Sequence, residues 1–170
     1  MNLDFLPGFL GLGTLLLHIL IVLFILSFIV KIKSLIELKK YFLDNSNLFS
    51  FLIAVSATII SLIYSEILLL APCNLCWYQR VFIYPLSIIF LIALIKKETK
   101  IRIYTLSLAV IGALIALYHY LIQMFNLSSF CDLTSAVPCN TIYILEFGYI
   151  TIPLMSLTAF IVIILLNLKK

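Results

Sequence analysis

Apolar residues in this chain are gathered into five long runs separated by short polar segments. The runs extend over residues 8–30, 48–71, 77–95, 103–122 and 149–168. Each is close to the roughly 20 residues that a helix needs to cross about 30 Å of hydrocarbon. Because an open strand in lipid would leave its backbone N–H and C=O groups unpaired, each run is predicted to be helical. The pattern predicts an all-α integral membrane protein with five transmembrane helices.

The basic residues lie in alternate connections between these runs. Ten of the eleven lysines and arginines follow the first run, separate the third from the fourth, or end the chain. They are Lys31, Lys33, Lys39, Lys40, Lys96, Lys97, Lys100, Arg102, Lys169 and Lys170. Since cytoplasmic loops of membrane proteins are enriched in Lys and Arg, this pattern predicts an outer N-terminus and a cytoplasmic C-terminus. All four cysteines then lie on the outer side.

Composition supports the membrane assignment. Of the 170 residues, 65% are hydrophobic and 11% charged, and the mean hydropathy is +1.27. These values exclude a soluble globular domain and a disordered tail. The formal net charge is +4, but no basic cluster is long enough or interleaved with aromatic residues, so we expect no nucleic-acid partner.

The first run is predicted to be a true helix rather than a cleaved signal peptide. It lacks a basic segment before it and small cleavage residues after it, and it is too long for the apolar part of a signal peptide. Its one ionisable residue, His18, lies in mid-membrane, where a charge is costly. We therefore expect His18 to be a neutral histidine that bonds to a neighbouring helix.

Cys73 and Cys76 form the first of two short-range cysteine pairs. A bridge across so short a spacer removes little chain entropy from the unfolded state, so a redox-active dithiol is favoured over a stabilising bridge. Cys76 lies where the third run begins, and the positive end of the predicted helix favours a thiolate there. Gln79 and Arg80 follow on the same helix face. Arg80 needs an anionic or polar partner, such as a thiolate or a cofactor oxygen, unless it snorkels to headgroups.

The second pair, Cys131 and Cys139, is separated by a short loop segment. Pro138 biases Val137 toward an extended backbone, so the two cysteines can bridge. The residues alone leave open whether the bridge is a structural staple or part of a redox relay. His119, near the outer end of the fourth run, is either a proton donor for a reduced cofactor or a satisfied core histidine.

Residues 73–80 read Cys-Asn-Leu-Cys-Trp-Tyr-Gln-Arg, and the second cysteine pair follows in a later loop. This combination resembles the DsbB family of disulfide-bond-forming membrane proteins over about residues 48–168. The short second loop with Pro138-Cys139 looks most like the compact BdbC-type members. The resemblance implies a DsbB-like four-helix redox domain over 48–170, preceded over 1–47 by an extra N-terminal transmembrane helix and a basic cytoplasmic loop.

The resemblance implies a membrane thiol:quinone oxidoreductase. Its partner would be a DsbA-like thioredoxin-fold thiol oxidase, which it reoxidises so that disulfide bonds can form in exported proteins. The cofactor would be a quinone, either ubiquinone or menaquinone. The protein would lie in the bacterial cytoplasmic membrane, with its redox cysteines on the periplasmic or extracellular face.

Residue roles follow from the same resemblance. Cys131 would form the mixed disulfide with the oxidase, and Cys139 would be its partner cysteine. Cys73 and Cys76 would take the electrons from that pair. The residues implied at the quinone are Cys76, Gln79, Arg80 and His119.

Two other classes of function compete with this interpretation. One is a membrane protein that binds or transports a metal ion through its four outer thiolates. Against it, an oxidising exterior favours disulfides, neither loop contains a histidine beside its cysteines, and Arg80 opposes cation entry. The other is a structural membrane subunit with two static disulfides, which would leave Arg80 unexplained.

Overall fold

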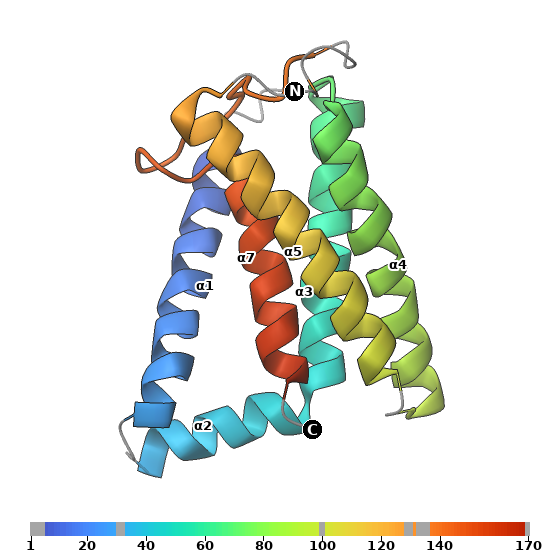
Figure 1. The fold of residues 1–170 in the computed structure, drawn as a ribbon. Helices are drawn as coiled ribbons and strands as arrows, with labels where there is room; N and C mark the ends of the chain where they lie inside the picture. The colour runs from blue at the N-terminus through green and yellow to red at the C-terminus, as the bar shows by residue number, and fades with distance from the viewer. Residues whose placement is uncertain (1–5, 30–32, 99–100, 128–130, 132–136, 169–170) are drawn as a thin grey trace.

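The computed structural model describes residues 6–29, 33–98, 101–127, 131 and 137–168, and this part of the chain is almost entirely helical (Figure 1). The elements are α1 (Leu6–Ile29), α2 (Lys33–Asp44), α3 (Ser46–Leu62), the π-helical turn η1 (Ile63–Ile67), α4 (Asn74–Lys96), α5 (Arg102–Phe125) and α7 (Ile152–Asn167). Some basic residues used to predict the orientation, Lys31, Lys100, Lys169 and Lys170, lie outside the described residues.

The long helices fit a multi-pass membrane protein. Within the described residues, four segments are long and apolar enough to cross a bilayer, namely α1, α3 with η1, α4 and α5. The helix α7 is equally apolar but has only 16 residues, fewer than the roughly 20 of a typical span. Five transmembrane helices and their orientation therefore stay predictions.

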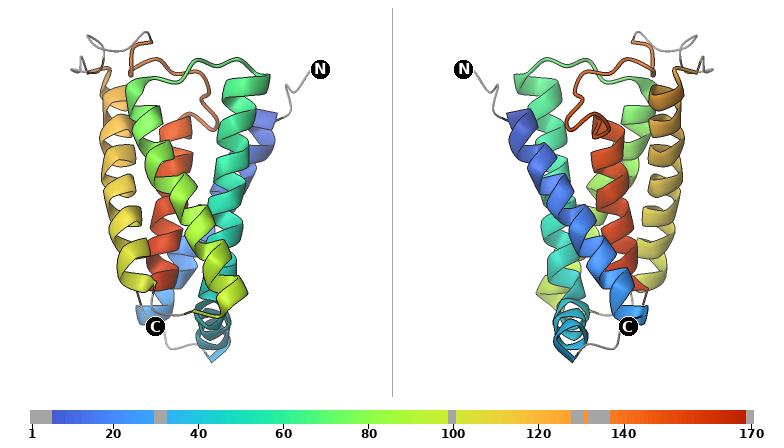
Figure 2. Two further views of the ribbon diagram at one scale, coloured as in Figure 1. Left: turned by 90° about the vertical axis from the view of Figure 1, so that its right-hand side faces the viewer. Right: turned by 90° about the vertical axis from the view of Figure 1, so that its left-hand side faces the viewer.

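The helices α3, α4, α5 and α7 form a bundle (Figure 2). Ala54, Leu86, Phe90 and Phe160 are fully buried in its core. The helices α5 and α7 cross at Gly112, where an added Cβ would lie 2.4 Å from the Phe160 ring. Because that position admits no side chain, the glycine permits this close packing of α5 on α7.

Several helix ends differ from those predicted by the apolar runs, and three of them lie near the cysteines. The helix α4 begins at Asn74, so the first cysteine pair caps and starts it instead of preceding it. The regular part of α3 ends at Leu62 and continues only as η1, and Leu69 then turns the chain with a φ of 53°. The helix α7 begins at Ile152, after a turn with positive φ at Phe147 and Gly148. Apolar side chains thus continue beyond the regular helices.

The basic connection after α1 contains the helix α2, where the sequence predicts a loop. Its apolar side chains recur at helical spacing among lysines, so it is amphipathic and too polar to be recognised as a span. In Figure 1, α2 lies across the end of the bundle opposite the start of α4.

The helix α1 packs against α7 and α2, and makes no such packing with α3 or α4 within the described residues. In mid-helix, His18 Nε2 lies 2.9 Å from Thr158 Oγ1 of α7, which confirms the predicted bond to a neighbouring helix. The Tyr149 ring stacks on the imidazole at 6.1 Å between centroids. Nearer the cysteine end, an added Cβ at Gly11 would lie 3.0 Å from Glu146 Cβ, so this glycine lets α1 approach the loop closely.

Candidate functional site

The first cysteine pair lies where α4 begins. Cys73, with φ −75° and ψ 171°, is the N-cap of α4, and Cys76 lies in the first turn. The two sulfurs are 3.3 Å apart and unbridged. Cys73 is buried, whereas Cys76 is partly exposed. The start of α4 thus holds a dithiol with one buried sulfur and one partly exposed sulfur.

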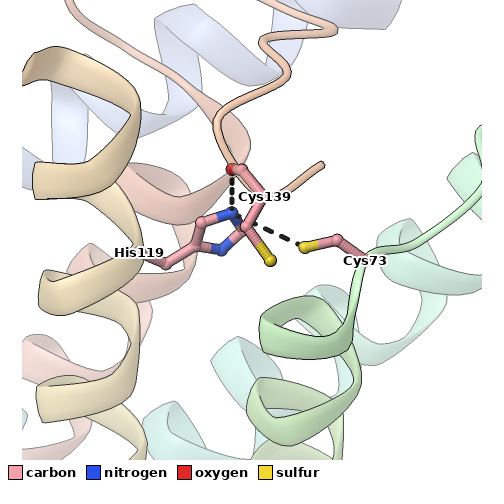
Figure 3. A group of neighbouring side chains, drawn as sticks. All are labelled: Cys73, His119 and Cys139. Carbon is pink, nitrogen blue, oxygen red and sulfur yellow. Dashed lines mark hydrogen bonds between the residues drawn. The ribbon is translucent and has the colours of Figure 1, made fainter. Parts of the chain in front are cut away.

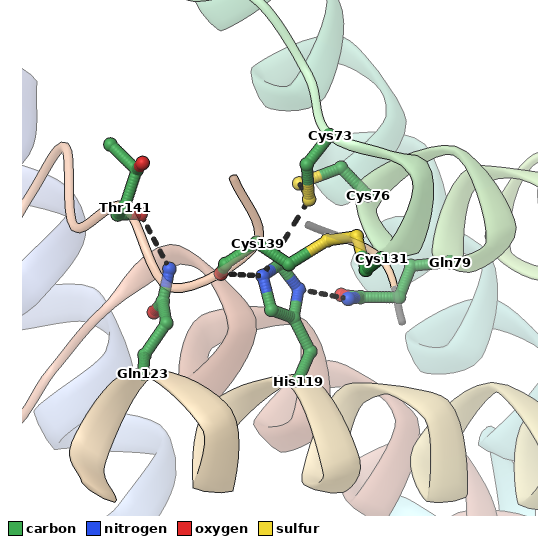
Figure 4. Close-up of a disulfide and its surroundings, with 8 residues drawn as sticks. All are labelled: Cys73, Cys76, Gln79, His119, Gln123, Cys131, Cys139 and Thr141. Atoms are coloured by element: carbon green, nitrogen blue, oxygen red, sulfur yellow. Dashed lines mark hydrogen bonds between the residues drawn. A yellow bond between two sulfur atoms is a disulfide. The ribbon is translucent and has the colours of Figure 1, made fainter. Parts of the chain in front are cut away.

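The second pair, Cys131 and Cys139, forms a disulfide with a Cα–Cα distance of 6.0 Å (Figure 4). This confirms the prediction that the two cysteines can bridge. Figure 3 shows Cys139 beside Cys73 and His119. The Sγ atoms of Cys73 and Cys139 and a ring nitrogen of His119 all lie within 4.8 Å of one another. The loop disulfide therefore lies against the dithiol of α4.

His119 of α5 joins the two pairs and is 1% exposed. Its Nε2 lies 3.0 Å from the carbonyl oxygen of Cys139 and 3.7 Å from Cys73 Sγ. Because a carbonyl oxygen can only accept, Nε2 carries the hydrogen, and Nδ1 accepts from the Gln79 amide at 2.9 Å. Gln79 thus fixes the tautomer that points an N–H group at the junction of the two pairs.

These contacts favour a negative charge on Cys73. The hydrogen bond with the Cys76 thiol and the nearby His119 outweigh the opposing effect of burial and lower the pKa of Cys73 from 9.0 to about 4. The sequence places the thiolate of the pair on Cys76 through the helix end. In the structure, Cys73 has the closer stabilising contacts on the side that faces the loop disulfide.

We expect the thiolate absorbance of the reduced protein near neutral pH to persist as the pH falls and to be half lost near pH 4. The pKa of Cys73 in the folded protein, about 4, lies below its value in the unfolded chain. The Cys73 thiolate therefore contributes fully to the stability of the reduced protein above the unfolded pKa, and this contribution is lost as the pH falls through about 4. The measurement is ultraviolet absorbance against pH, taken as the difference from a Cys73→Ser variant. A difference signal that titrates near pH 8 would contradict it.

The loop that carries Cys139 is tied to the helices by residues that the sequence interpretation does not single out. Gln123 Nε2 donates to the Thr141 carbonyl oxygen at 2.9 Å. The Tyr143 hydroxyl donates to the Ala71 carbonyl oxygen at 3.2 Å, next to the α4 turn. Gln123 lies one turn after His119 in the mainly apolar helix α5, and that spacing is the signal that could have indicated a polar face.

Arg80 is 8% exposed and turns inward instead of snorkelling. Its Nε donates to Ser61 Oγ at 2.9 Å and its Nη2 to the Ser61 carbonyl oxygen at 3.0 Å. The guanidinium carbon lies 5.0 Å from the centroid of the Trp77 ring. A guanidinium has five N–H donors, and Ser61 accepts from two of them. Arg80 joins α4 to α3 while its charge stays inside the protein.

A cavity of about 600 Å³ lies between α1, α3, α4 and α7, a size typical of small-molecule sites. Cys76, Gln79 and Arg80, three of the residues predicted at the quinone, line its cysteine end. The fourth, His119, lines instead a separate void of about 20 Å³ that also contacts Cys73. The structure thus places His119 between the cysteine pairs and away from the larger cavity.

The cavity fits a quinone. Tyr64 lines it and is 5% exposed, and its hydroxyl has no hydrogen-bond partner among the described residues. A buried hydroxyl without a partner costs on the order of 1–3 kcal/mol, which a ligand oxygen in the cavity would offset. A neutral quinone has two carbonyl oxygens that accept hydrogen bonds, and Tyr64 and Arg80 are donors. Both line the same end of the cavity as Cys76.

The grouping of Cys73, His119 and Cys139 also bears on a metal site. The fold brings a histidine to the cysteines, so the absence of a histidine from both loops no longer argues against a metal. Cys139 is bonded to Cys131, however, and a disulfide sulfur is not the thiolate that zinc or copper prefers. A metal site here requires the loop disulfide to be reduced first.

Fold and site together define a helical membrane protein in which a dithiol lies between a loop disulfide and an apolar cavity. The chain belongs to the DsbB family, because the family model described as disulfide bond formation protein DsbB matches residues 44–169. The helix α1 and nearly all of α2 precede the matched residues.

Several curated relatives are similar to this chain. It is 40% identical over 126 residues to the probable disulfide formation protein C of Halalkalibacterium halodurans, which covers 74% of this chain and 92% of that protein. It is 45% identical over 117 residues to disulfide bond formation protein C of Bacillus subtilis, and that alignment covers 68% of this chain and 85% of the relative. It is 43% identical over 119 residues to the SPbeta prophage-derived disulfide bond formation protein B of Bacillus subtilis. That alignment covers 70% of this chain and 80% of the relative. No solved structure matches the chain.

Proposed function

We propose that this protein is a thiol:quinone oxidoreductase that reoxidises a DsbA-like thioredoxin-fold oxidase and so supports disulfide formation in exported proteins. The names of the family and of the relatives support a role in disulfide formation. One observation carries the rest of the proposal. Cys73 lies within 4.8 Å of Cys139, sulfur to sulfur, while Cys76, three residues on, lines the cavity. The first pair is thus in contact with both the loop disulfide and the quinone site.

The first exchange takes place at the loop. A thiolate of the reduced partner attacks Cys131 Sγ, the Cys131–Cys139 bond breaks, and Cys139 leaves as a thiolate. The partner's second thiolate then attacks its own sulfur in the mixed disulfide and releases Cys131. The partner has lost two electrons and two protons, and the loop pair has gained them.

The second exchange takes place at the junction with His119. The Cys139 thiolate attacks Cys73 of an oxidised Cys73–Cys76 pair, and Cys76 leaves as a thiolate. Cys131 then attacks Cys139, the loop disulfide forms again, and Cys73 leaves as a thiolate. The His119 N–H, at 3.7 Å from Cys73 Sγ, stabilises that leaving charge.

The last transfer takes place at the cavity. The Cys73–Cys76 dithiol gives up two electrons and two protons and closes to a disulfide. A bound quinone supplies the acceptor for two electrons and two protons. Cys76 presents its sulfur to the cavity, and Arg80 and Tyr64 present hydrogen-bond donors that orient the acceptor oxygens.

The direct test mixes the purified protein with a reduced thioredoxin-fold oxidase and a short-chain quinone. Quinone absorbance is followed while the thiols of the partner are counted. We expect one quinone to be reduced for each partner dithiol oxidised. A protein that leaves both reactants unchanged, or that carries a metal on reduced cysteines, would contradict the proposal in favour of a structural or metal-binding role.

We expect a His119→Phe variant to slow exchange between the two cysteine pairs by about 10- to 100-fold, because a charge-assisted hydrogen bond is worth roughly 1.5–3 kcal/mol. Without the imidazole N–H the pKa of Cys73 rises, so the pH profile of the exchange shifts to higher pH. The conservative His119→Gln variant keeps an N–H donor and should recover part of the rate. An unchanged pH profile in His119→Phe would show that the histidine is only a packing residue.

A further inference from the structure

The cavity that begins at Cys76 continues along most of α1. The α1 wall runs from Leu10 to Phe24, which is about 21 Å at a rise of 1.5 Å per residue. The facing wall on α3 and η1 runs from Phe49 to Tyr64, and Leu38 of α2 lies at the opposite end. The space is therefore long and narrow, and it extends well beyond the residues that contact a quinone ring.

The polar side chains that line this cavity are concentrated at its cysteine end, although Thr14, Ser56 and Ser156 line it elsewhere and Lys39 lines its α2 end. Arg80, Ser61, Gln79 and Tyr64, whose hydroxyl has no hydrogen-bond partner among the described residues, line the end of the cavity that Cys76 also lines. Beyond them the wall consists mainly of leucine, isoleucine, phenylalanine and alanine side chains. A matching ligand has an oxygen-bearing head at the cysteine end and a long hydrocarbon chain behind it.

The cavity has room between α1 and α3 because these two helices, as far as the structure describes them, do not pack against each other. The bond between His18 and Thr158 and the close approach at Gly11 hold α1 on α7 and on the loop before it. No packing joins α1 to α3 or α4 in the described part of the chain. The residues matched by the family model begin after α1, so this wall is an addition to the bundle that the relatives share.

We infer that α1 forms one wall of a binding site for the polyprenyl tail of the quinone, and this inference rests on the proposed function. The ring lies at Cys76, Arg80 and Tyr64, and the tail lies between α1, α3 and α7. A phospholipid acyl chain could enter the same apolar space, and Arg80 could meet its phosphate, but only a quinone head can accept electrons from the Cys76 sulfur that lines this end. The tail site makes the protein selective for quinones with long tails.

Two glycines on α1 allow a matched test. At Gly13, which lines the cavity, an added Cβ meets no atom within 4 Å, so a phenylalanine there enters the cavity without disturbing the docking of α1. At Gly8 an added Cβ also meets nothing within 4 Å, but this residue is not among those lining the cavity. Gly13→Phe is therefore the test variant and Gly8→Phe the control.

The measurement is kcat/KM for a tail-less quinone and for a polyprenyl quinone with the same ring, in detergent, with reduced partner in excess. We expect the wild type to prefer the polyprenyl quinone. Gly13→Phe should lower kcat/KM for that quinone about tenfold, the loss that follows when roughly two methylene groups leave an apolar site. The tail-less quinone, whose turnover also reports correct folding, should be unaffected, and Gly8→Phe should behave as the wild type.

The outcomes separate the tail site from the proposed function. If the wild type reduces both quinones equally well, or if Gly13→Phe slows both to the same extent, the tail site is overturned while quinone reduction stands. If the wild type reduces neither quinone, the proposed function fails and the tail site fails with it. Solvent extraction of the purified protein gives a second readout. Polyprenyl quinone in the wild-type extract and its loss in Gly13→Phe support the site, whereas phospholipid alone in both extracts overturns it.

Discussion

A Cys76→Ser variant is expected to oxidise one equivalent of reduced partner and then stop, with no quinone reduced. The loop disulfide between Cys131 and Cys139 is intact in this variant, so it can accept the electrons of one partner molecule. Serine cannot form a disulfide with Cys73, so the electrons have no path onward. Steady turnover should fall by a factor on the order of 10³ or more, as for other essential covalent groups.

The experiment counts partner thiols against time at several protein concentrations. The amount of partner oxidised in the variant should equal the amount of protein and should be independent of added quinone. Cys131→Ser is the matched control, because it removes the loop disulfide itself and should oxidise no partner at all. Continued turnover of the partner by Cys76→Ser would show that electrons leave the loop pair without passing through the first pair.

The helices were predictable because the lipid environment imposes a length and a polarity on each of them. Every apolar run of the sequence contains a helix of the structure, and the bonding of His18 followed from the cost of a charge in mid-membrane. The bridge between Cys131 and Cys139 followed from their short separation. The inward turn of Arg80 was one of two alternatives, and contacts with Ser61 distinguished them.

The arrangement of the site depended on contacts between distant parts of the chain. His119 reaches Cys139 across 20 residues and Gln79 across 40, and no local pattern encodes such pairs. The cavity depends on the distance that α1 keeps from α3, which follows from its docking on α7. Tyr64 reads as one more aromatic residue near a helix end, and only its burial without a hydrogen-bond partner marks it.

We expect Arg80→Gln to raise KM for quinone by about 10- to 100-fold, because hydrogen bonds to charged groups contribute roughly 1.5–3 kcal/mol. The first equivalent of partner should still be oxidised at the wild-type rate, since that exchange uses only Cys131 and Cys139. Quinone reduction is measured over a range of quinone concentrations, and the partner burst is measured without quinone. Arg102→Gln is the control, because Arg102 lies at the opposite end of the bundle and donates to the Leu168 carbonyl oxygen.

Arg80 also joins α4 to α3 through Ser61, so its effect on quinone must be separated from its effect on packing. Ser61→Ala removes the acceptor of the Nε hydrogen bond but leaves the guanidinium charge at the cavity. If the charge orients the quinone, Ser61→Ala should lower thermal stability while changing the quinone KM much less than Arg80→Gln does. If both variants raise KM equally, Arg80 acts by holding the two helices together, and the quinone contact assigned to it is wrong. Arg80→Gln with an unchanged KM would refute that contact as well, because a buried arginine beside the acceptor cannot lose its charge without weakening the bound state.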